Sequence, residues 1–314
     1  MCHLSLCTIM PATLTPSSTT RSETWKGHLA LIGQTLVISL GYVFGREAAQ
    51  VFDPLTLTGL RALFSGLLYI VLLALIQKGN PLATWQAFSQ PIRQRLLLLA
   101  VLGIFFNQLL FNWGLRYTTA TTTAIIYALT PSVVFFLGLW VFRRERLLWN
   151  KVLPLLMAYA GVVLALWHNF LHTSYGWESI LLGVAVIFWG FYLNYSPPIM
   201  AKLGAFRATG YIMVYGAFLH LPTLLAGLWR QDWSQISPEA WISLFYLVLG
   251  MSIAAYSLLN YGLRFLTPTQ AALYINMQPI ATLLIVALIG QEPLSWQLLV
   301  AALLTSSGML LFRR

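Results

Sequence analysis

Long apolar runs separated by short polar stretches fill the chain from His28 to the C-terminus. Each run holds roughly 17 to 25 residues, long enough for a helix to cross a hydrocarbon core of about 30 Å. The runs are residues 28–47, 55–77, 95–116, 119–142, 151–167, 177–197, 207–229, 240–263, 267–290 and 295–312. They are about twice as long as barrel strands, and a backbone in lipid must satisfy its own hydrogen bonds. The pattern therefore predicts an all-α polytopic membrane protein with ten transmembrane helices.

Composition excludes a large soluble domain. Of 314 residues 59% are hydrophobic and only 8% are charged, against about 25% charged in an average soluble chain. The mean hydropathy is +0.76. Short polar turns such as 78–81, 143–146 and 290–293 join the runs, so little sequence remains for another domain.

The net charge of +10 is explained by membrane topology. With a cytoplasmic N-terminus, Arg46, Arg116 and Arg230 lie outside and Arg61 lies within the second span. The cytoplasmic side then carries Arg21, Lys26, Lys78, Arg93, Arg95, Arg143, Arg144, Arg146, Lys151, Lys202, Arg207, Arg264, Arg313 and Arg314. This bias follows the positive-inside rule. It predicts that both termini are cytoplasmic and gives no support for a nucleic-acid partner.

Residues 1–27 form a Ser- and Thr-rich stretch, which we interpret as a disordered cytoplasmic tail. It lacks the basic and apolar regions of a signal peptide, and either Met1 or Met10 fits as the start. Both cysteines, Cys2 and Cys7, lie here, and their positions favour reduced thiols rather than a disulfide framework or a metal site.

An internal repeat relates two parts of the chain. FNWGLRYTTATTTAIIYALTP at 111–131 recurs as LNYGLRFLTPTQAALYINMQP at 259–279, an offset of 148 residues. The third to fifth spans thus correspond to the eighth to tenth, which predicts five-helix repeats at 28–167 and 177–312. An odd number of spans places the two halves in the membrane in opposite orientations, as in many secondary transporters. The alternative is an old duplication kept for helix packing.

These features resemble the EamA-type drug/metabolite transporter superfamily. The resemblance rests on ten spans, the FDPLTLTGLRALFSGLLYIVLL stretch at 52–73, and the Gly-Leu-Arg-aromatic turns before spans ending in Thr-Pro or Gln-Pro. It covers roughly residues 28–312. It implies a bacterial inner-membrane carrier, often an exporter of amino acids or other small metabolites. It also implies a central cavity lined mainly by the first, third, fourth, sixth, eighth and ninth spans.

Polar and aromatic residues form stripes along several spans, and an amide facing lipid would lose its hydrogen bonds. The ninth span carries one at Gln270, Tyr274, Gln278 and Thr282. The candidates for lining a substrate cavity are Gln34, Gln108, Tyr127, Thr130, Trp189, Tyr192, Tyr256, Tyr274 and Gln278. Hydrogen bonding between helices is the alternative role for each. Asn112 and Asn260, near the repeated turn, are interpreted as turn caps.

Three further residues are expected to act in gating or structure. Pro131 and Pro279 occupy matching positions within the fourth and ninth spans, where proline frees a carbonyl and can kink the helix. Arg61 is the charge clearly inside a span, where an arginine costs roughly 2.5 to 3.5 kcal/mol. We expect it to snorkel or to pair with Glu47 or Asp53. No Asp or Glu lies at midspan, so no carboxylate proton relay is evident.

The sequence as a whole predicts a secondary transporter, expected to export small organic metabolites such as amino acids by alternating access. Its expected partners are a small-molecule substrate and membrane lipid, and the chain is expected to be a monomer or a weak homodimer. No cofactor, metal or catalytic residue is expected. The alternatives are a channel or an integral membrane enzyme acting on lipid. The enzyme would need clustered carboxylates, a histidine pair or a metal site, and His168 and His172 lack an acidic third ligand.

Overall fold

The computed structural model describes residues 24–144, 178–290 and 296–312, together with 152–154, 156, 157, 159–161, 163 and 164. Helices dominate these residues, which contain no β-strand. Most of the predicted tail, residues 1–23, and seven of the 17 residues of the fifth predicted span lie outside the described residues. The first helix begins at Thr24, a few residues earlier than the hydrophobic run indicated.

Helices of the first half run largely as the hydrophobic pattern predicts. Their bounds are α1 Thr24–Val51, α2 Pro54–Gln77, α3 Pro81–Gln86, α4 Gln90–Leu99, α5 Asn107–Tyr117, α6 Ala120–Tyr127 and α7 Thr130–Trp140. A π-helical stretch, Ala100–Phe106, joins α4 to α5 and is called the first π segment below. Asp53 begins α2 as its N-cap, since its side chain accepts a hydrogen bond from the N–H of Leu55 and Pro54 follows.

The second half repeats this plan with more interruptions. Its helices are α9 Glu178–Tyr195, α10 Pro197–Leu203, α11 Ala205–Leu219, α12 Leu221–Arg230, α13 Pro238–Tyr246, α14 Tyr256–Gly262, α15 Pro268–Leu273, α16 Gln278–Leu288 and α17 Trp296–Phe312. Leu247–Ala255 is the second π segment. The 3₁₀ turns are Trp233–Gln235 and Tyr274–Met277.

Candidate membrane spans number six in the described residues, or up to eight if two bent helix pairs each count as one. The bent pairs are α9 with α10, at 46°, and α11 with α12, at 50°. A shorter apolar helix covers residues within 152–161, and α17 has 17 residues. The all-helical membrane architecture is thus shown, whereas the number ten stays a prediction.

The offset of 148 residues found in the sequence also relates the secondary structure. It carries α7, Thr130–Trp140, onto α16, Gln278–Leu288, residue for residue. The two π segments overlap under the same shift. Pro131 and Pro279 are each the second residue of the helix after a break, which suits proline because its missing N–H is not needed there.

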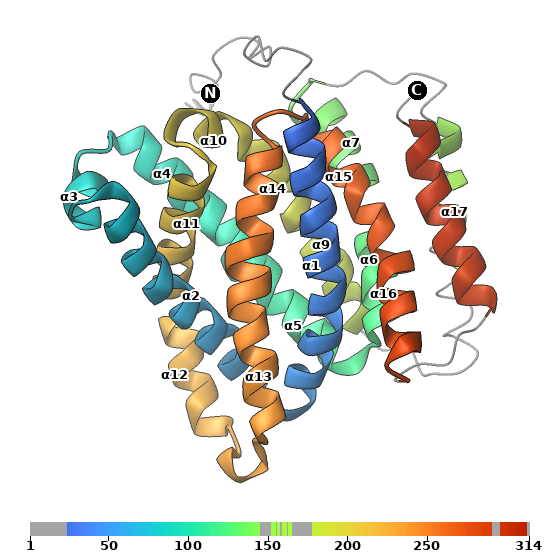
Figure 1. Ribbon diagram of the computed structural model, residues 1–314, viewed down its shortest axis with the longest axis horizontal. Helices are drawn as coiled ribbons and strands as arrows, with labels where there is room; N and C mark the ends of the chain where they lie inside the picture. Colours follow the sequence, from blue (N-terminus) through green and yellow to red (C-terminus); the bar gives the residue numbers. More distant parts are fainter. Residues whose placement is uncertain are drawn as a thin grey trace, which may run out of the picture.

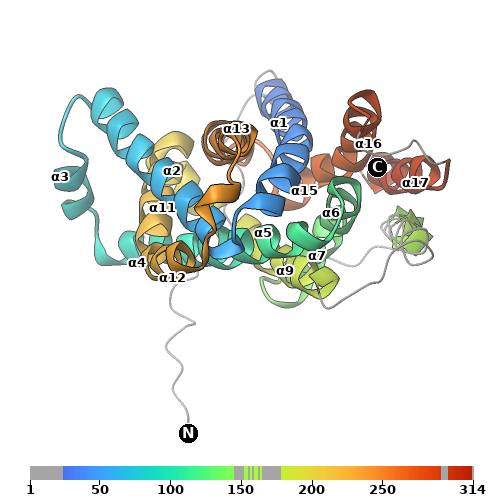
Figure 2. The same cartoon turned by 90° about the horizontal axis from the view of Figure 1, so that it is seen from below.

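The equivalent spans run in opposite directions through the molecule. In Figure 1, α4 lies near the top with α5 lower down, whereas α13 lies at the bottom with α14 above it. Packing is reciprocal: α5 contacts α9, α14 contacts α1, and α2 packs against α11. Seen from below, α1 and α13 lie on one side, α5 and α9 lie on the other, and α17 lies at the edge beside α16 (Figure 2).

Repeated asparagines join the second and third spans of each half. Nδ2 of Asn112 donates to Oγ1 of Thr58 at 3.0 Å, and Nδ2 of Asn260 donates to Oγ1 of Thr209 at 2.8 Å. All four residues are fully buried, at 0% exposure. Each threonine hydroxyl also donates to the carbonyl four residues earlier, at 2.7 Å. The interpretation of the asparagines as turn caps is therefore wrong: they hold two helices together.

Replacing either threonine with valine is expected to destabilise the fold by a similar amount. Valine keeps the shape but removes the interhelical acceptor of one asparagine N–H, and hydrogen bonds of this kind contribute about 0.6 to 1.7 kcal/mol. Thermal unfolding in detergent should show matched losses for Thr58→Val and Thr209→Val. Thr84→Val is the control, because its hydroxyl bonds only to the Asn80 carbonyl one turn earlier. A loss at one site alone would contradict the equivalence.

Candidate functional site

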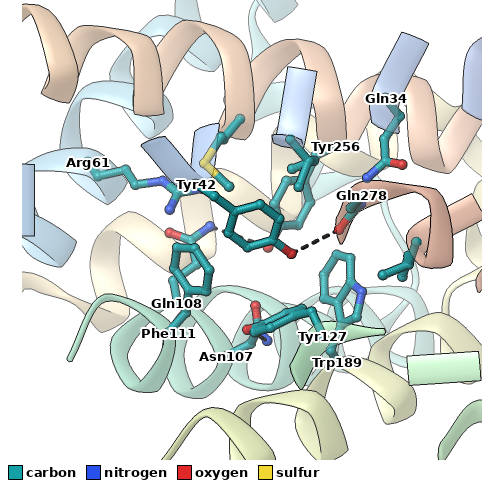
Figure 3. Close-up of a pocket in the computed structure, with 13 residues that line it drawn as sticks. Gln34, Tyr42, Arg61, Asn107, Gln108, Phe111, Tyr127, Trp189, Tyr256 and Gln278 are labelled. Carbon is teal, nitrogen blue, oxygen red and sulfur yellow. Dashed lines mark hydrogen bonds between the residues drawn. The ribbon is translucent and has the colours of Figure 1, made fainter. Parts of the chain in front are cut away.

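A buried cavity lies at the centre of the molecule, between spans of both repeats (Figure 3). It is lined by Gln34, Ile38, Tyr42, Arg61, Asn107, Gln108, Phe111, Tyr127, Trp189, Met251, Tyr256, Ile275 and Gln278. Its volume is about 50 Å³, which is room for a few water molecules, since each needs about 10 to 15 Å³ on this measure. The conformation is therefore contracted, and an organic solute would enter only if lining side chains moved apart.

Most of the residues expected at a cavity come together here. The expected residues that line it are Gln34, Gln108, Tyr127, Trp189, Tyr256 and Gln278. They come from both repeats and from α1, α5, α6, α9, α14 and α16. Arg61, expected to have a structural or gating role, lines the same cavity.

Three expected residues are not among those that line the cavity. The ring of Tyr192 stacks on Trp189 with centroids 4.9 Å apart, and its hydroxyl bonds to Asn260 at 3.2 Å. The Thr130 hydroxyl donates to the Tyr127 carbonyl of its own span at 2.5 Å. Tyr274 lies against His28, with 2.5 Å between its hydroxyl and Nδ1. The contacts of Tyr192 and Tyr274 join different helices, as in the alternative role, whereas the contact of Thr130 lies within its own span.

Tyr42 and Asn107 were missed by the sequence analysis, although both complete the polar lining. The Tyr42 hydroxyl donates to Oε1 of Gln278 at 2.9 Å, which connects α1 to α16. Nδ2 of Asn107 donates to the Tyr127 hydroxyl at 2.9 Å. Asn107 lies next to Gln108, which the sequence analysis singled out, and for both missed residues the polar side chain was the available signal.

Aromatic rings form much of the remaining wall. The Phe111 and Tyr127 rings meet edge to face with centroids 5.4 Å apart, and Tyr42 lies 5.8 Å from Phe111. Across the cavity, Trp189 meets Tyr256 edge to face at 5.3 Å. Such rings combine apolar faces with polar tips, so the wall can enclose an organic solute and still offer hydrogen bonds.

Side chains satisfy backbone carbonyls in both π segments. The Tyr256 hydroxyl donates to the Gly103 carbonyl at 2.8 Å, and Nε2 of His220 lies 3.1 Å from the carbonyl of Ile104. In the second π segment, the Ile253 carbonyl accepts from the Tyr69 hydroxyl at 3.3 Å. Single π turns inside α-helices occur frequently at functional sites. Here the second segment contributes Met251 to the cavity lining, and the first ends directly before the lining residue Asn107.

Arg61 pairs with neither of the carboxylates expected from the sequence. Its Nε donates to Oγ of Ser252 at 2.9 Å, and the residue is 1% exposed. Glu47 instead accepts from the Ser243 hydroxyl at 2.9 Å. Asp53 lies 3.8 Å from the guanidinium of Arg230. The hypothesis of snorkelling or boundary pairing for Arg61 is therefore wrong.

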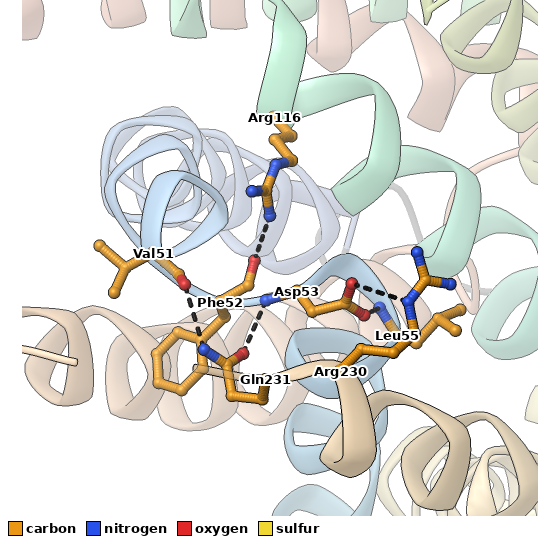
Figure 4. A network of polar contacts seen from close by, with 7 residues as sticks. All are labelled: Val51, Phe52, Asp53, Leu55, Arg116, Arg230 and Gln231. Carbon is orange, nitrogen blue, oxygen red and sulfur yellow. Dashed lines mark hydrogen bonds and ion pairs between the residues drawn. The ribbon is translucent and has the colours of Figure 1, made fainter. Parts of the chain in front are cut away.

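A polar network joins helix ends at the end of the molecule opposite the start of α1 (Figures 1 and 4). Gln231 makes two hydrogen bonds to the turn between α1 and α2. Its Oε1 accepts from the Asp53 N–H at 2.7 Å, and its Nε2 donates to the Val51 carbonyl at 3.3 Å. Nη1 of Arg116 donates to the Phe52 carbonyl at 2.8 Å. Arg46 donates to the Arg116 carbonyl. The ends of α1, α5 and α12 are thereby tied together.

Apolar helices long enough to cross a membrane, arranged as two repeats around a buried cavity, define a polytopic membrane protein of the transporter class. The sequence matches the model of the EamA-like transporter family twice, at residues 25–167 and 176–314. The chain belongs to this family.

The individual relatives that the chain resembles are named as transporters or as an exporter. The chain is 21% identical over 275 residues to the uncharacterized transporter YetK of Bacillus subtilis, covering 85% of this chain and 80% of the relative. It is 24% identical to the uncharacterized inner membrane transporter YedA of Escherichia coli, covering 85% and 83%. A probable terminal-alkyne amino-acid exporter of Streptantibioticus cattleyicolor is 26% identical over 216 residues, covering 68% and 70%. One crystal structure is similar in fold, with a TM-score of 0.66, 18% identity, and coverage of 93% and 96%.

Proposed function

We propose that this protein is a secondary transporter that exports small organic metabolites such as amino acids across the bacterial cytoplasmic membrane. It would do so with ten spans in two inverted halves and with both termini cytoplasmic. The family and the relatives described above support this proposal. In Figure 1, α1 begins and α17 ends at one end of the molecule, where α3, α4 and α10 also lie. Arg46, Arg116 and Arg230 lie toward the other end, in agreement with the charge bias.

The central cavity is the observation that carries this proposal. Both repeats contribute its polar and aromatic lining, as expected for a site around which the two halves alternate. In this proposal the end with the Gln231 and Arg116 network is the non-cytoplasmic one, and these hydrogen bonds would have to break for outward release. We propose that the breaks before Pro131 and Pro279 let the fourth and ninth spans bend during this change.

Counterflow in proteoliposomes tests the function. Vesicles are loaded with one unlabelled amino acid or small metabolite at a time, and uptake of the labelled counterpart is followed. A transporter is expected to give saturable trans-stimulation by one class of solute. Empty vesicles and vesicles with heat-denatured protein are the controls. Conductance far above carrier turnover would favour a channel. Release of a modified lipid, with no trans-stimulation across the panel, would favour an enzyme.

Gln278→Leu is expected to raise the KM for transport about fivefold or more. Leucine has nearly the same volume, but it removes the amide that lines the cavity and leaves the buried Tyr42 hydroxyl without its acceptor, at a cost of about 1 to 3 kcal/mol. Thr130→Val is the control from a matching position of the other repeat, because Thr130 bonds within its own span. Equal KM values for both variants and the unmodified protein would remove Gln278 from the site.

A further inference from the structure

Arg61 carries a positive charge that no described carboxylate neutralises. Its guanidinium has five N–H donors. Among the described residues, one of these donors makes a hydrogen bond, from Nε to Oγ of Ser252. Its electrostatic neighbours are the neutral rings of Tyr256 and Tyr127. A buried charge normally has a partner of opposite sign. A charge kept at this depth, facing a cavity, suits a ligand that supplies its own negative group.

Gln108 provides the complementary acceptor. Its Oε1 is buried and makes no hydrogen bond to the described residues, while its Nε2 donates to the Tyr256 hydroxyl at 3.4 Å. In Figure 3, Gln108 lies beside the guanidinium of Arg61, and the ring of Tyr256 faces the same part of the cavity. A strong donor with a positive charge thus adjoins an unsatisfied oxygen.

We propose that Arg61 and Gln108 form a head-group site for an α-amino acid, with the carboxylate bound by Arg61 and the ammonium by Oε1 of Gln108. This inference rests on the proposed transport function and assigns its substrate class. The two charged groups of an α-amino acid share one carbon atom, which matches neighbouring donor and acceptor side chains. The side chain of the substrate would then extend toward the aromatic wall around Trp189.

The charge of the solute distinguishes an α-amino acid from a simple amine and from a phosphorylated solute at this site. A solute that is only an amine would place a second cation next to Arg61 in a medium of low dielectric constant, where like charges repel strongly. A phosphorylated solute carries about two negative charges, and Arg61 is the one lining residue with a positive charge among those that the structure describes. A single carboxylate neutralises the charge of Arg61, and the ammonium of the α-amino acid then needs a neutral acceptor, which Oε1 of Gln108 supplies.

Competition in the counterflow assay tests the head-group site. The probe is the amino acid with the largest counterflow in the panel, and the competitors are the same amino acid unlabelled, its carboxamide and its decarboxylated amine. The carboxamide and the amine keep the ammonium and the side chain but lack the negative charge. We expect half inhibition to require at least a tenfold higher concentration of the carboxamide or of the amine than of the unlabelled amino acid.

Arg61→Gln adds a test of the residue itself. The variant should lose the preference for the amino acid over its carboxamide, a change of selectivity that a merely structural role would not produce. Arg264→Gln, an exposed arginine at the end of the eighth span, is the control and should keep the preference. If Arg61→Gln does not fold, the competition assay on the unmodified protein, with the carboxamide and the amine as competitors, tests the head-group site by itself.

The outcomes distinguish the two proposals. Amino-acid counterflow that the carboxamide inhibits as well as the acid does would overturn the head-group site and leave the transport function standing. A preference for the acid that persists in folded Arg61→Gln would also overturn it. Absence of counterflow for every amino acid in the panel would overturn amino-acid transport and the head-group site with it.

Discussion

Gly227→Ala is expected to lower the free energy of unfolding by about 2 to 3 kcal/mol, although a helical Gly→Ala change ordinarily stabilises by about 0.5 to 1 kcal/mol. Gly227 lies in α12 where this helix meets the start of α2. A Cβ atom at this position would lie 2.5 Å from the backbone nitrogen of Thr56 and 2.9 Å from the carbonyl carbon of Leu55. Because these atoms belong to the backbone, no rotamer change can relieve the clash. The two helices would have to separate.

Gly183→Ala is the matched control, with an effect of opposite sign. Gly183 lies in α9, another apolar helix, and a Cβ atom there would meet no atom of the described residues within 4 Å. We expect this variant to unfold at the same or a slightly higher temperature than the unmodified protein. Both are measured by tryptophan fluorescence during heating in one detergent. Equal stabilities for the two variants would show that α2 and α12 do not approach as closely as the structure indicates.

Much of the fold follows from the sequence, because hydrophobic run length and internal repetition depend on local residues. The shift of 148 residues that aligns Asn112 with Asn260 also aligns the bounds of α7 and α16. Burial of amides away from lipid likewise follows from composition, which is why Gln34, Gln108 and Gln278 are expected inside and lie there.

The direction in which each side chain points is harder to predict from the sequence, because the spans are not regular α-helices. Treating the ninth span as continuous places Gln270, Tyr274 and Gln278 on one face. Residues 274–277 instead form a 3₁₀ turn with about 3.0 residues per turn, which rotates Tyr274 away from Gln278. Gln270 is exposed, in a capping box with Thr267. The Thr267-Pro268-Thr269-Gln270 stretch matches the capping-box pattern of a helix start, whereas the 3₁₀ turn has no distinctive residue pattern.

Contacts distant in sequence account for the other errors. The hydrogen-bond partner of Arg61 is Ser252, 191 residues further along the chain. A local pattern offers only the neighbouring Glu47 and Asp53 as partners for a buried cation. Likewise, the interaction of Tyr42 with Gln278 spans 236 residues. Both partners become evident only when the two repeats are packed against each other.

Tyr256→Phe is expected to reduce the transport rate about tenfold or more while leaving the protein folded. Tyr256 follows the second π segment directly, and its hydroxyl donates to the Gly103 carbonyl in the first. Position 256 is the equivalent of position 108 under the 148-residue shift, and Gln108 bonds to the same hydroxyl. One oxygen atom therefore joins the two repeats beside the cavity. Loss of such a buried hydrogen bond, with an acceptor left unsatisfied, costs about 1 to 3 kcal/mol.

Tyr261→Phe is the control for this prediction, since it makes the same chemical change on the same helix, five residues further on and outside the cavity lining. Initial rates of counterflow are compared at equal amounts of reconstituted protein, with thermal unfolding as the check on folding. If the hydroxyl couples the repeats, Tyr256→Phe slows transport at saturating substrate, whereas Tyr261→Phe leaves the rate unchanged. If only the KM rises for Tyr256→Phe, the hydroxyl binds substrate and the two π segments move independently of this contact. Equal rates for both variants would show that the contact between the repeats at Gly103 has no part in transport.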